Sequence, residues 1–332
     1  MRDGTIAYLA FTERGRALAQ RLCADLGGEV SCTRDGVTLE EWTSRWFTNV
    51  SALVYIGAAG IAVRAVAPHL VSKASDPAVV CLDEGGRFAI PLLSGHLGGA
   101  NELARRIARV CGAVCVITTA TDVLGVFAVD EWARVQGMRV VDPRGIKAVS
   151  AKLLAGESVV VCSAFPMDGE PPEGVFLRDS GAADVWVDVR PHAGLVLAPR
   201  ALTLGVGCKR GVTRETLEER FAALCQSAGI LPEAVGCAAT IDRKRDEPGL
   251  LDFCAAHTWP LKTYSAGELA AAEGAFTSSS FVSETVGVDN VCERAAVCAA
   301  GGALLVKKFA GDGVTLALAQ RDCRLDWRWS RG

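Results

Sequence analysis

Ser51-Ala-Leu-Val-Tyr-Ile-Gly-Ala-Ala-Gly60 is the stretch that decides the fold class. After Ser51 it begins as a continuous apolar run, which is typical of a strand buried on both faces of a parallel sheet. The run leads directly into a turn that begins and ends with glycine, and a helical pattern follows over residues 61–67. A buried strand, a glycine turn and a helix together form the repeating unit of α/β proteins with parallel sheets.

The same alternation recurs on both sides of this stretch. Before it lie a β-rich run at residues 5–11 and a helical run at 13–26, with Thr12 as the predicted N-cap. After it, two strands joined by a tight turn precede a helix and a further strand, at residues 78–82, 87–93, 97–110 and 113–117. This is the pattern of a doubly wound sheet.

Prolines interrupt the pattern between residues 126 and 199, where only short strand-like runs remain. A new strand–helix–strand pattern begins directly after Pro199, at residues 201–207, 214–228 and 234–241. We therefore predict an α/β fold of two αβ-layered domains with mainly parallel sheets, joined by a smaller, Pro-rich middle region. The predicted boundaries are residues 1–125, 126–199 and 200–332.

The composition limits the compartment and the classes of partner. The 332 residues are 50% hydrophobic and 22% charged, with a formal net charge of -3. This balance supports a sizeable core and argues against nucleic acid or an anionic membrane as a partner. The thirteen cysteines show no CxxC spacing and no nearby histidine at zinc-ligand spacing. Because the chain also has no apolar leader and no bilayer-spanning run, we expect a cytoplasmic protein with reduced thiols and no metal of its own.

Pro91-Leu-Leu-Ser-Gly-His-Leu-Gly-Gly-Ala-Asn-Glu102 carries the first candidate site. Its glycines let the backbone approach a ligand closely, and His96 is one of four histidines in the chain. An imidazole with a carboxylate six residues later, at Glu102, is suited to proton transfer near neutral pH. The same residues also fit a tight turn before a helix N-terminus, with His96 as a cap or a packing residue.

Four loops of the N-terminal half each follow a predicted strand, at residues 57–60, 83–84, 95–102 and 118–122. If their strands are parallel, the loops share one edge of the sheet and form a single cleft. An antiparallel arrangement of the strands around Asp83 would move that turn elsewhere.

Leu204-Gly-Val-Gly-Cys-Lys-Arg-Gly-Val-Thr213 is the second candidate site. Its glycines, the following helix N-terminus and the cations of Lys209 and Arg210 favour a carboxylate or phosphate ligand. The spacing differs from both the Walker loop and the dinucleotide fingerprint, and an ordinary turn with a solvated Lys-Arg pair is the alternative. Two further tracts are the charged run at residues 242–247, which follows a strand, and Asn290 with Glu293, spaced as a capping box before a helix.

Six tracts in this order resemble the CbiG family, the cobalt-precorrin-5A hydrolases of the anaerobic cobalamin pathway: residues 55–64, 91–102, 118–122, 205–211, 242–247 and 286–296. The C-terminal part by itself resembles CobE, a small protein of the aerobic pathway. The resemblance implies a substrate that is a cobalt-bearing, ring-contracted tetrapyrrole with a δ-lactone and many carboxylates. The implied reaction is water-dependent opening of that lactone with release of acetaldehyde.

On this reading we assign roles to the candidate residues from their own chemistry, and none of the roles is taken from an established catalytic scheme. His96 is expected to be the general base, with Glu102 or Asp83 as an orienting group or an alternative base. The residues expected to bind substrate are Gly57, Gly60, Arg64, Gly95, Gly98, Gly99, Asn101, Thr119, Asp122, Gly205, Gly207, Cys208, Lys209, Arg210, Asn290, Glu293 and Arg294.

Cobalt belongs to the implied substrate, so no cofactor of the protein is expected. The expected partners are this small-molecule substrate and, transiently, neighbouring methyltransferases of the pathway. A homodimer is one option for the oligomeric state.

Two other functions stay open. A non-catalytic tetrapyrrole-binding or hand-over protein would need the cationic loop but not His96 and Glu102 together. A dinucleotide-dependent oxidoreductase on a Rossmann-like sheet would need a different glycine spacing and an acidic residue at the end of its second strand.

Overall fold

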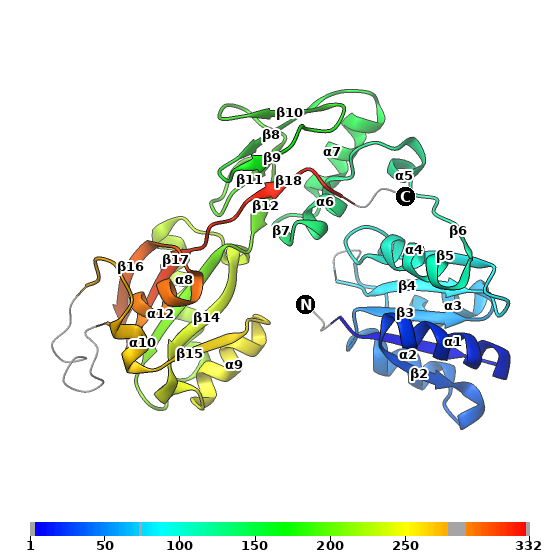
Figure 1. Ribbon diagram of the computed structural model, residues 1–332, viewed down its shortest axis with the longest axis horizontal. Coiled ribbons are helices and arrows are strands. Elements are labelled where there is room, and N and C mark those ends of the chain that lie inside the picture. The colour runs from blue at the N-terminus through cyan, green and yellow to red at the C-terminus, as the bar shows by residue number, and fades with distance from the viewer. Residues whose placement is uncertain (1–3, 73–74, 278–289, 330–332) are drawn as a thin grey trace.

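The structure, a computed structural model, describes residues 4–72, 75–277 and 290–329. Three main sheets with their helices make up the molecule, which confirms the predicted α/β class (Figure 1). None of the helices within the described residues has the length and apolar character needed to cross a membrane.

The N-terminal sheet has six strands in the order β2-β1-β3-β4-β5-β6. Its neighbouring strands are parallel except for β4 and β5, which pair antiparallel. The stretch that decides the fold class forms β3, which is buried along its whole length as its apolar run predicts. The strands are β1 (Ile6–Ala10), β2 (Glu29–Cys32), β3 (Ala52–Ile56), β4 (Ala78–Leu82), β5 (Phe88–Leu93) and β6 (Val114–Cys115).

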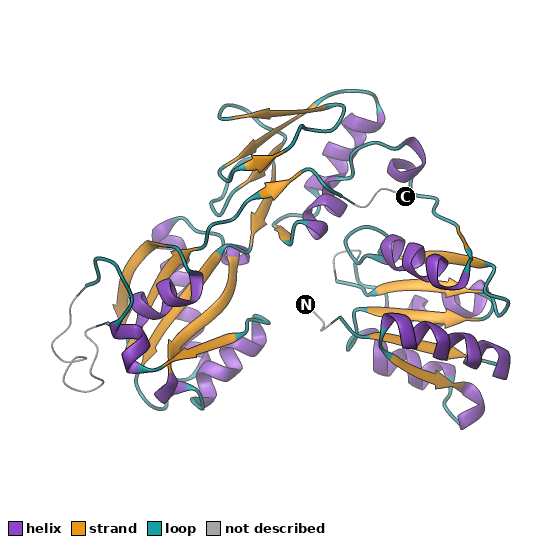
Figure 2. Ribbon diagram, viewed as in Figure 1, coloured by secondary structure: helices purple, strands orange, loops and turns teal. Residues whose placement is uncertain are grey.

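Helices pack on both faces of this sheet (Figure 2), because alternate residues of its strands point to opposite sides. One face carries α1 (Glu13–Leu26) and α4 (Ala100–Cys111), and the other carries α2 (Leu39–Phe47) and α3 (Ala59–Val66). Thr12 caps α1 by accepting the Gly15 N–H at 3.1 Å, as predicted. Helix α4 begins three residues later than predicted, because the chain between β5 and α4 makes a turn.

The antiparallel β4–β5 pair divides the predicted cleft. Strand β5 runs in the opposite direction to β4. The turn at residues 83–84 and the loop after β5 therefore lie at opposite ends of the strands, that is, at opposite edges of the sheet. Residues 57–60 lie at the same edge as the turn at residues 83–84, and residues 118–122 lie at the same edge as the loop after β5. The condition for one cleft, that the strands are all parallel, is therefore not met, and the alternative of antiparallel strands around Asp83 is confirmed.

The middle region holds a five-stranded sheet in the order β10-β8-β11-β12-β7. Its strands are parallel except for β7, which pairs antiparallel with β12. The strands are β7 (Met138–Val140), β8 (Val159–Ser163), β10 (Val175–Arg178), β11 (Val185–Val187) and β12 (Leu195–Pro199), and the helices are α6 (Val129–Val135) and α7 (Gly145–Leu154). The short helix α5 (Ala120–Leu124) directly precedes this region.

The C-terminal sheet, in the order β15-β14-β13-β17-β16, is half parallel and half antiparallel. Its parallel strands are β13 (Leu202–Cys208), β14 (Val235–Ile241) and β15 (Leu261–Tyr264), and its hairpin is β16 (Ala303–Gly311) with β17 (Val314–Gln320). The helices are α8 (Arg214–Ala228), α9 (Pro248–Ala256), α10 (Ala266–Ala270) and α12 (Val291–Ala300).

One apolar core joins the middle and C-terminal sheets, whereas the N-terminal sheet has cores of its own. The chain end also returns to the middle region: β18 (Leu325–Asp326) pairs with β9 (Met167–Asp168), as Figure 1 shows. Trp327 stacks on Trp132 of α6 with ring centroids 5.1 Å apart. The end of the predicted C-terminal domain thus packs on the middle region, and the three domain boundaries stay a prediction.

Candidate functional site

The turn after β5 owes its shape to its glycines. A Cβ at Gly98 would lie 2.4 Å from that of Ser94. A Cβ at Gly95 would lie 2.8 Å from Asn101 Oδ1. Gly99 has a φ of 83° and directly precedes α4. These glycines fold the turn itself, and their role in substrate binding stays a prediction.

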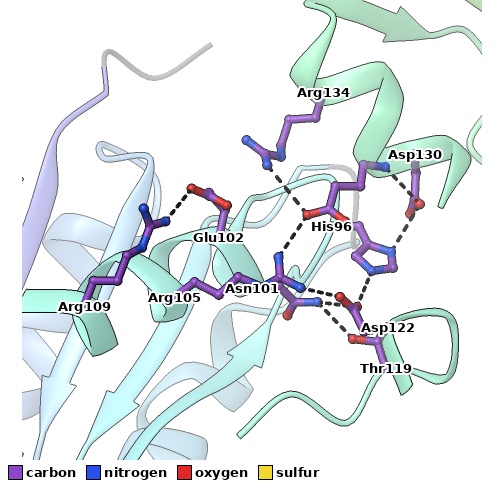
Figure 3. A network of polar contacts seen from close by, with 10 residues as sticks. His96, Asn101, Glu102, Arg105, Arg109, Thr119, Asp122, Asp130 and Arg134 are labelled. Atoms are coloured by element: carbon purple, nitrogen blue, oxygen red, sulfur yellow. Dashed lines mark hydrogen bonds and ion pairs between the residues drawn. The ribbon is translucent and has the colours of Figure 1, made fainter. Parts of the chain in front are cut away.

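His96, in this turn, lies buried between two carboxylates (Figure 3). Its Nε2 is 2.8 Å from Asp122 Oδ2 and its Nδ1 is 3.2 Å from Asp130 Oδ1. Burial lowers the pKa of His96, but the hydrogen bonds and charges of the two carboxylates outweigh it and raise the pKa to about 9. The imidazole is therefore protonated at neutral pH and donates from both nitrogens.

Two residues of α4 extend this network toward α5 and α6. Asn101 donates to Thr119 Oγ1 at 2.9 Å and to Asp122 Oδ2 at 3.0 Å. The Arg105 guanidinium donates to Asp122 Oδ1 and, at 3.3 Å, to Glu131 Oε1. Burial raises the pKa of Glu131, and the charge of Arg105 opposes this effect. The network thus joins the N-terminal sheet to the middle region.

The network combines predicted residues with residues that the sequence analysis missed. The predicted members are His96, Asn101, Thr119 and Asp122. The missed members are Arg105, Asp130, Glu131 and Arg134, whose guanidinium lies 3.9 Å from Glu131. With His96 protonated, three cationic side chains face three carboxylates, so the buried charges balance. No local motif marks the missed residues, because Asp130, Glu131 and Arg134 lie on a separate helix and Arg105 lies beyond the glycine-rich tract.

His96, Asp122 and Glu131 also bring their ligand atoms within 4.8 Å of one another, a spacing at which residues can hold a metal ion. However, the Arg105 guanidinium is bonded to both carboxylates, and a cation there would have to displace it. The set therefore fits an ion-pair network better than a metal site. The absence of a resident metal stays a prediction.

The geometry does not suit His96 as a general base. A base must offer an unprotonated nitrogen to its substrate, whereas both nitrogens of His96 are bonded to carboxylates. Glu102 does not orient it either. Its carboxylate lies 3.6 Å from the Arg109 guanidinium and points away from the imidazole (Figure 3). That part of the prediction is wrong, because successive residues of a helix face different directions.

The prediction that Asp83 orients His96 is also wrong. Its carboxylate accepts the backbone N–H groups of its own turn, from Gly85, Arg87 and Phe88. These bonds hold the pKa of Asp83 below its ordinary value despite the opposing effect of burial. The turn lies at the sheet edge opposite His96, so Asp83 cannot orient that imidazole.

The predicted substrate ligands Gly57 and Gly60 follow β3 at the same edge of the sheet as Asp83, and the third, Arg64, lies in the last turn of α3. A cavity of about 400 Å³ at this edge is lined by Gly57 and Asp83 together with Phe11, Ala58, Ile61 and Glu84. Gly57 lets the Phe11 ring approach, since a Cβ would lie 2.7 Å from its Cδ2. Arg64 is exposed on α3. The predicted sites of the N-terminal half are thus split between two edges.

A larger cavity, of about 770 Å³, lies at the carboxyl ends of β13 and β14. Open α/β sheets bind ligands at this position. The cationic side chains in its lining are Lys209, Arg210, Arg243, Lys244 and Lys308. The other lining residues are Gly207, Cys208, Thr240, Ile241, Asn290, Val291, Ala310, Gly311, Asp312, Gly313, Val314 and Thr315. Among the described lining residues, cations outnumber the carboxylate of Asp312, so the cavity suits a ligand with several negative groups.

Sequence reasoning identified much of this wall. Gly207, Cys208, Lys209, Arg210 and Asn290 were assigned to substrate binding, and all of them line the cavity. The charged run at residues 242–247 supplies two more cations. Lys308 was missed, since no motif marks its place on β16. Burial raises the pKa of the Cys208 thiol to about 11, so this residue contributes a neutral group.

Two glycines of the tract at residues 204–213 have structural reasons to be glycine. A Cβ at Gly205 would lie 1.8 Å from the Cys292 carbonyl oxygen, because α12 packs directly on β13. Gly211 has a φ of 72°, and its N–H donates to Glu247 Oε1 at 2.7 Å. Lys244 donates to the other oxygen of this carboxylate at 2.9 Å. The Gly211 N–H is therefore occupied by the protein's own carboxylate.

Comparison with known proteins finds similarity in both the N-terminal and the C-terminal part of the chain. Residues 41–122 match the family profile described as "Cobalamin synthesis G N-terminal", and residues 202–319 match "Cobalamin synthesis G C-terminus". The "Cobalt-precorrin-5A hydrolase" of Salmonella typhimurium is 35% identical over 344 residues, covering 95% of this chain and 97% of that protein. The chain belongs to the CbiG family.

A second relative is similar over most of the chain, and a solved structure is similar over a smaller part of it. The "Cobalt-precorrin-5A hydrolase" of Priestia megaterium is 30% identical and covers 82% of this chain and 79% of its own. A solved structure of CobE, "a protein from the cobalamin (vitamin B12) biosynthetic pathway", is 31% identical over 36% of this chain and 89% of its own, with a TM-score of 0.35.

Two residues assigned to substrate binding in this CbiG chain are used in other ways. The Glu293 side chain is fully buried, and its carboxylate accepts backbone and hydroxyl hydrogen bonds. The Arg294 guanidinium donates to the Leu269, Ala270 and Ala272 carbonyls and lies 4.5 Å from the Phe276 ring centroid. Their assignment as direct substrate ligands is therefore wrong, because neither is part of the cavity wall.

Proposed function

We propose that the protein is a cobalt-precorrin-5A hydrolase and that the cavity at β13 and β14 binds its substrate. The observation that carries the proposal is the set of five cations around one cavity of about 770 Å³. The tetrapyrrole substrate implied by the family carries acetate and propionate side chains. Charge-assisted hydrogen bonds from Lys and Arg to such carboxylates are stronger than neutral ones.

The cavity has the mixed character that a tetrapyrrole requires. Cations from three separate tracts, represented by Lys209, Lys244 and Lys308, can contact carboxylates at different points of the ring edge. Small or apolar residues such as Gly207, Ile241 and Val314 complete the wall. Glycine lets backbone lie against a flat ring, because it has no side chain to hold the ring away.

The proposed reaction is redox-neutral and acts on a carbon–carbon bond. Water adds to the lactone carbonyl, and the ring C–O bond breaks to give a carboxylate and an alcohol. Loss of the alcohol proton then expels acetaldehyde. The electron pair of the broken C–C bond and one proton pass to the macrocycle. The donors at the cavity can stabilise the oxyanion that develops at the lactone carbonyl.

His96 has a different role in this proposal. Its protonated ring holds the turn after β5 to Asp122 and Asp130, and the residue is outside the lining of the cavity. The cobalt ion is carried by the substrate, so the proposal requires no cofactor of the protein. A cytoplasmic location also belongs to the proposal, supported by the thirteen free thiols. Contacts with pathway methyltransferases and a homodimer stay predictions.

Anaerobic incubation of the protein with cobalt-precorrin-5A, with detection of acetaldehyde, tests the proposal. We expect one acetaldehyde for each substrate consumed. Tight binding without acetaldehyde would refute the hydrolase and support the alternative hand-over function. Turnover that depends on added NAD(P)H would instead favour an oxidoreductase.

A further inference from the structure

Glu293 is a buried carboxylate directly behind the wall of the cavity. It is the third residue of α12, and its side chain is 0% exposed. Its carboxylate accepts the Thr277 N–H at 2.7 Å, the Thr277 hydroxyl at 2.8 Å and the Lys308 N–H at 2.6 Å. The sequence pattern predicts a capping box with Asn290, and half of it is present: Asn290 Oδ1 accepts the Glu293 N–H at 2.9 Å. The carboxylate itself accepts hydrogen bonds from two other segments, at Thr277 and at Lys308.

Lys308 lies where β16 is irregular. The register of β16 against β17 shifts between Val306 and Phe309, which is the signature of a β-bulge. A bulge leaves a backbone group out of the ladder and re-aims the side chains beside it. At this bulge the displaced Lys308 N–H is bonded to Glu293, and Lys308 is part of the cavity lining.

A second residue bonded to Glu293 belongs to the same wall. Asn290 also lines the cavity, and its Nδ2 donates to the Thr277 carbonyl at 2.8 Å. Asn290 and Glu293 therefore hold Thr277 through both its carbonyl and its N–H. Because α12 is fixed against β13 by close packing at Gly205, Glu293 ties the bulge of β16 to a rigid support.

We propose that Glu293 is a positioning residue that holds the β16 bulge so that Lys308 presents its ammonium group to a substrate carboxylate. The inference rests on the proposed function, since it assigns one cation of the cavity to substrate binding. Without the carboxylate, the Lys308 N–H loses its acceptor, and a buried unpaired N–H is unfavourable enough to reshape the bulge. Lys308 then no longer has a fixed position.

The test is a double-mutant cycle of Glu293→Gln and Lys308→Gln with cobalt-precorrin-5A as substrate. Glutamine has the same shape as glutamate, but its NH₂ group faces one of the two backbone N–H groups, of Thr277 and Lys308, that the carboxylate accepts. We expect Glu293→Gln to raise KM about tenfold with kcat nearly unchanged, the size of one lost charge-assisted contact. In the Lys308→Gln background, the same change should alter KM less than about twofold, because the cation it positions is already absent.

Glu268→Gln is the matched control. Glu268 occupies the same third position of α10, and its carboxylate accepts Ser265 N–H and hydroxyl at 2.7 Å, but it is exposed and outside the cavity lining. We expect its KM to equal that of the wild type. If Glu293→Gln does not fold, Glu293→Asp, which keeps the charge and shortens the side chain, enters the same cycle. We expect a smaller rise in KM that also disappears without the Lys308 ammonium.

Two results would overturn the inference: a wild-type KM in Glu293→Gln, or a rise in KM that is as large in the Lys308→Gln background. Either would leave Glu293 as a purely structural residue that holds Thr277 and the β16 backbone. The proposed function is tested separately by acetaldehyde release from the wild type. If that release is absent, the cycle can still be measured as Kd by a visible-absorption titration with cobalt-precorrin-5A, so the two failures are distinguishable.

Discussion

The buried imidazolium of His96 predicts a specific loss of stability at alkaline pH. An unfolded histidine has a pKa of about 6.5, whereas the two carboxylates raise the pKa of folded His96 to about 9. The folded state therefore holds the proton more tightly. Its contribution is complete below pH 6.5 and is lost as the pH rises through 9. The difference between the two pKa values corresponds to about 3 kcal/mol of unfolding free energy. Solvent screens the interaction of His96 with its carboxylates only slightly, since the His96 side chain is 9% exposed.

The measurement compares the wild type with His96→Gln in urea unfolding, from about pH 6 to about pH 9.5. The difference in unfolding free energy between the two proteins should shrink by about 3 kcal/mol over this range. Effects of other titrating groups cancel in the difference. His192→Gln is the control, because His192 has one carboxylate partner, Asp188 at 2.6 Å, and its side chain is 25% exposed. Because the chain has four histidines, an NMR titration can follow each imidazole and measure the pKa of His96 directly.

Parallel pH profiles for the wild type and His96→Gln would refute this reasoning, as would a His96 resonance that titrates below about pH 7. Turnover provides a second check. A folded His96→Gln enzyme should keep kcat within about threefold of the wild type. A loss of about 100-fold in a folded variant would restore His96 as a general base.

Three further predictions concern the other candidate residues. Asp83→Ala should leave kcat and KM within about twofold of the wild type and lower the unfolding free energy by about 1 kcal/mol, because its carboxylate bonds only its own turn; a kcat loss of about 100-fold would contradict its placement. Lys209→Gln with Arg210→Gln should raise KM at least about tenfold in the acetaldehyde assay, whereas Arg144→Gln, at an exposed residue with a side chain that is 91% accessible, should not. Unchanged KM in the double variant would remove the cavity from substrate binding. Gly205→Ala should cost about 3 kcal/mol or more in thermal unfolding, since its Cβ would lie 1.8 Å from a carbonyl oxygen; a wild-type Tm would show that α12 can move away from β13.

The sequence by itself determined the elements and their class. The apolar run at residues 52–56 became a fully buried strand, and Thr12 and Asn290 cap the helices that they were predicted to begin. These features depend on residues close together in the chain, through burial, periodicity and short-range hydrogen bonds. The glycine loop after β13 was also recognisable, because strand, glycines and cations are consecutive there.

Only the tertiary structure decided which side chains meet. The direction of β5 placed His96 and Asp83 at opposite edges, and nothing in the local pattern specifies whether a strand runs parallel or antiparallel. Asp130 changed His96 from an expected base into a buried cation, although the two residues are distant in sequence. Lys308 joined the cavity through a β-bulge held by a buried carboxylate. Charge pairing, strand direction and bulges depend on segments brought together by folding, and one segment read alone carries no record of its neighbours.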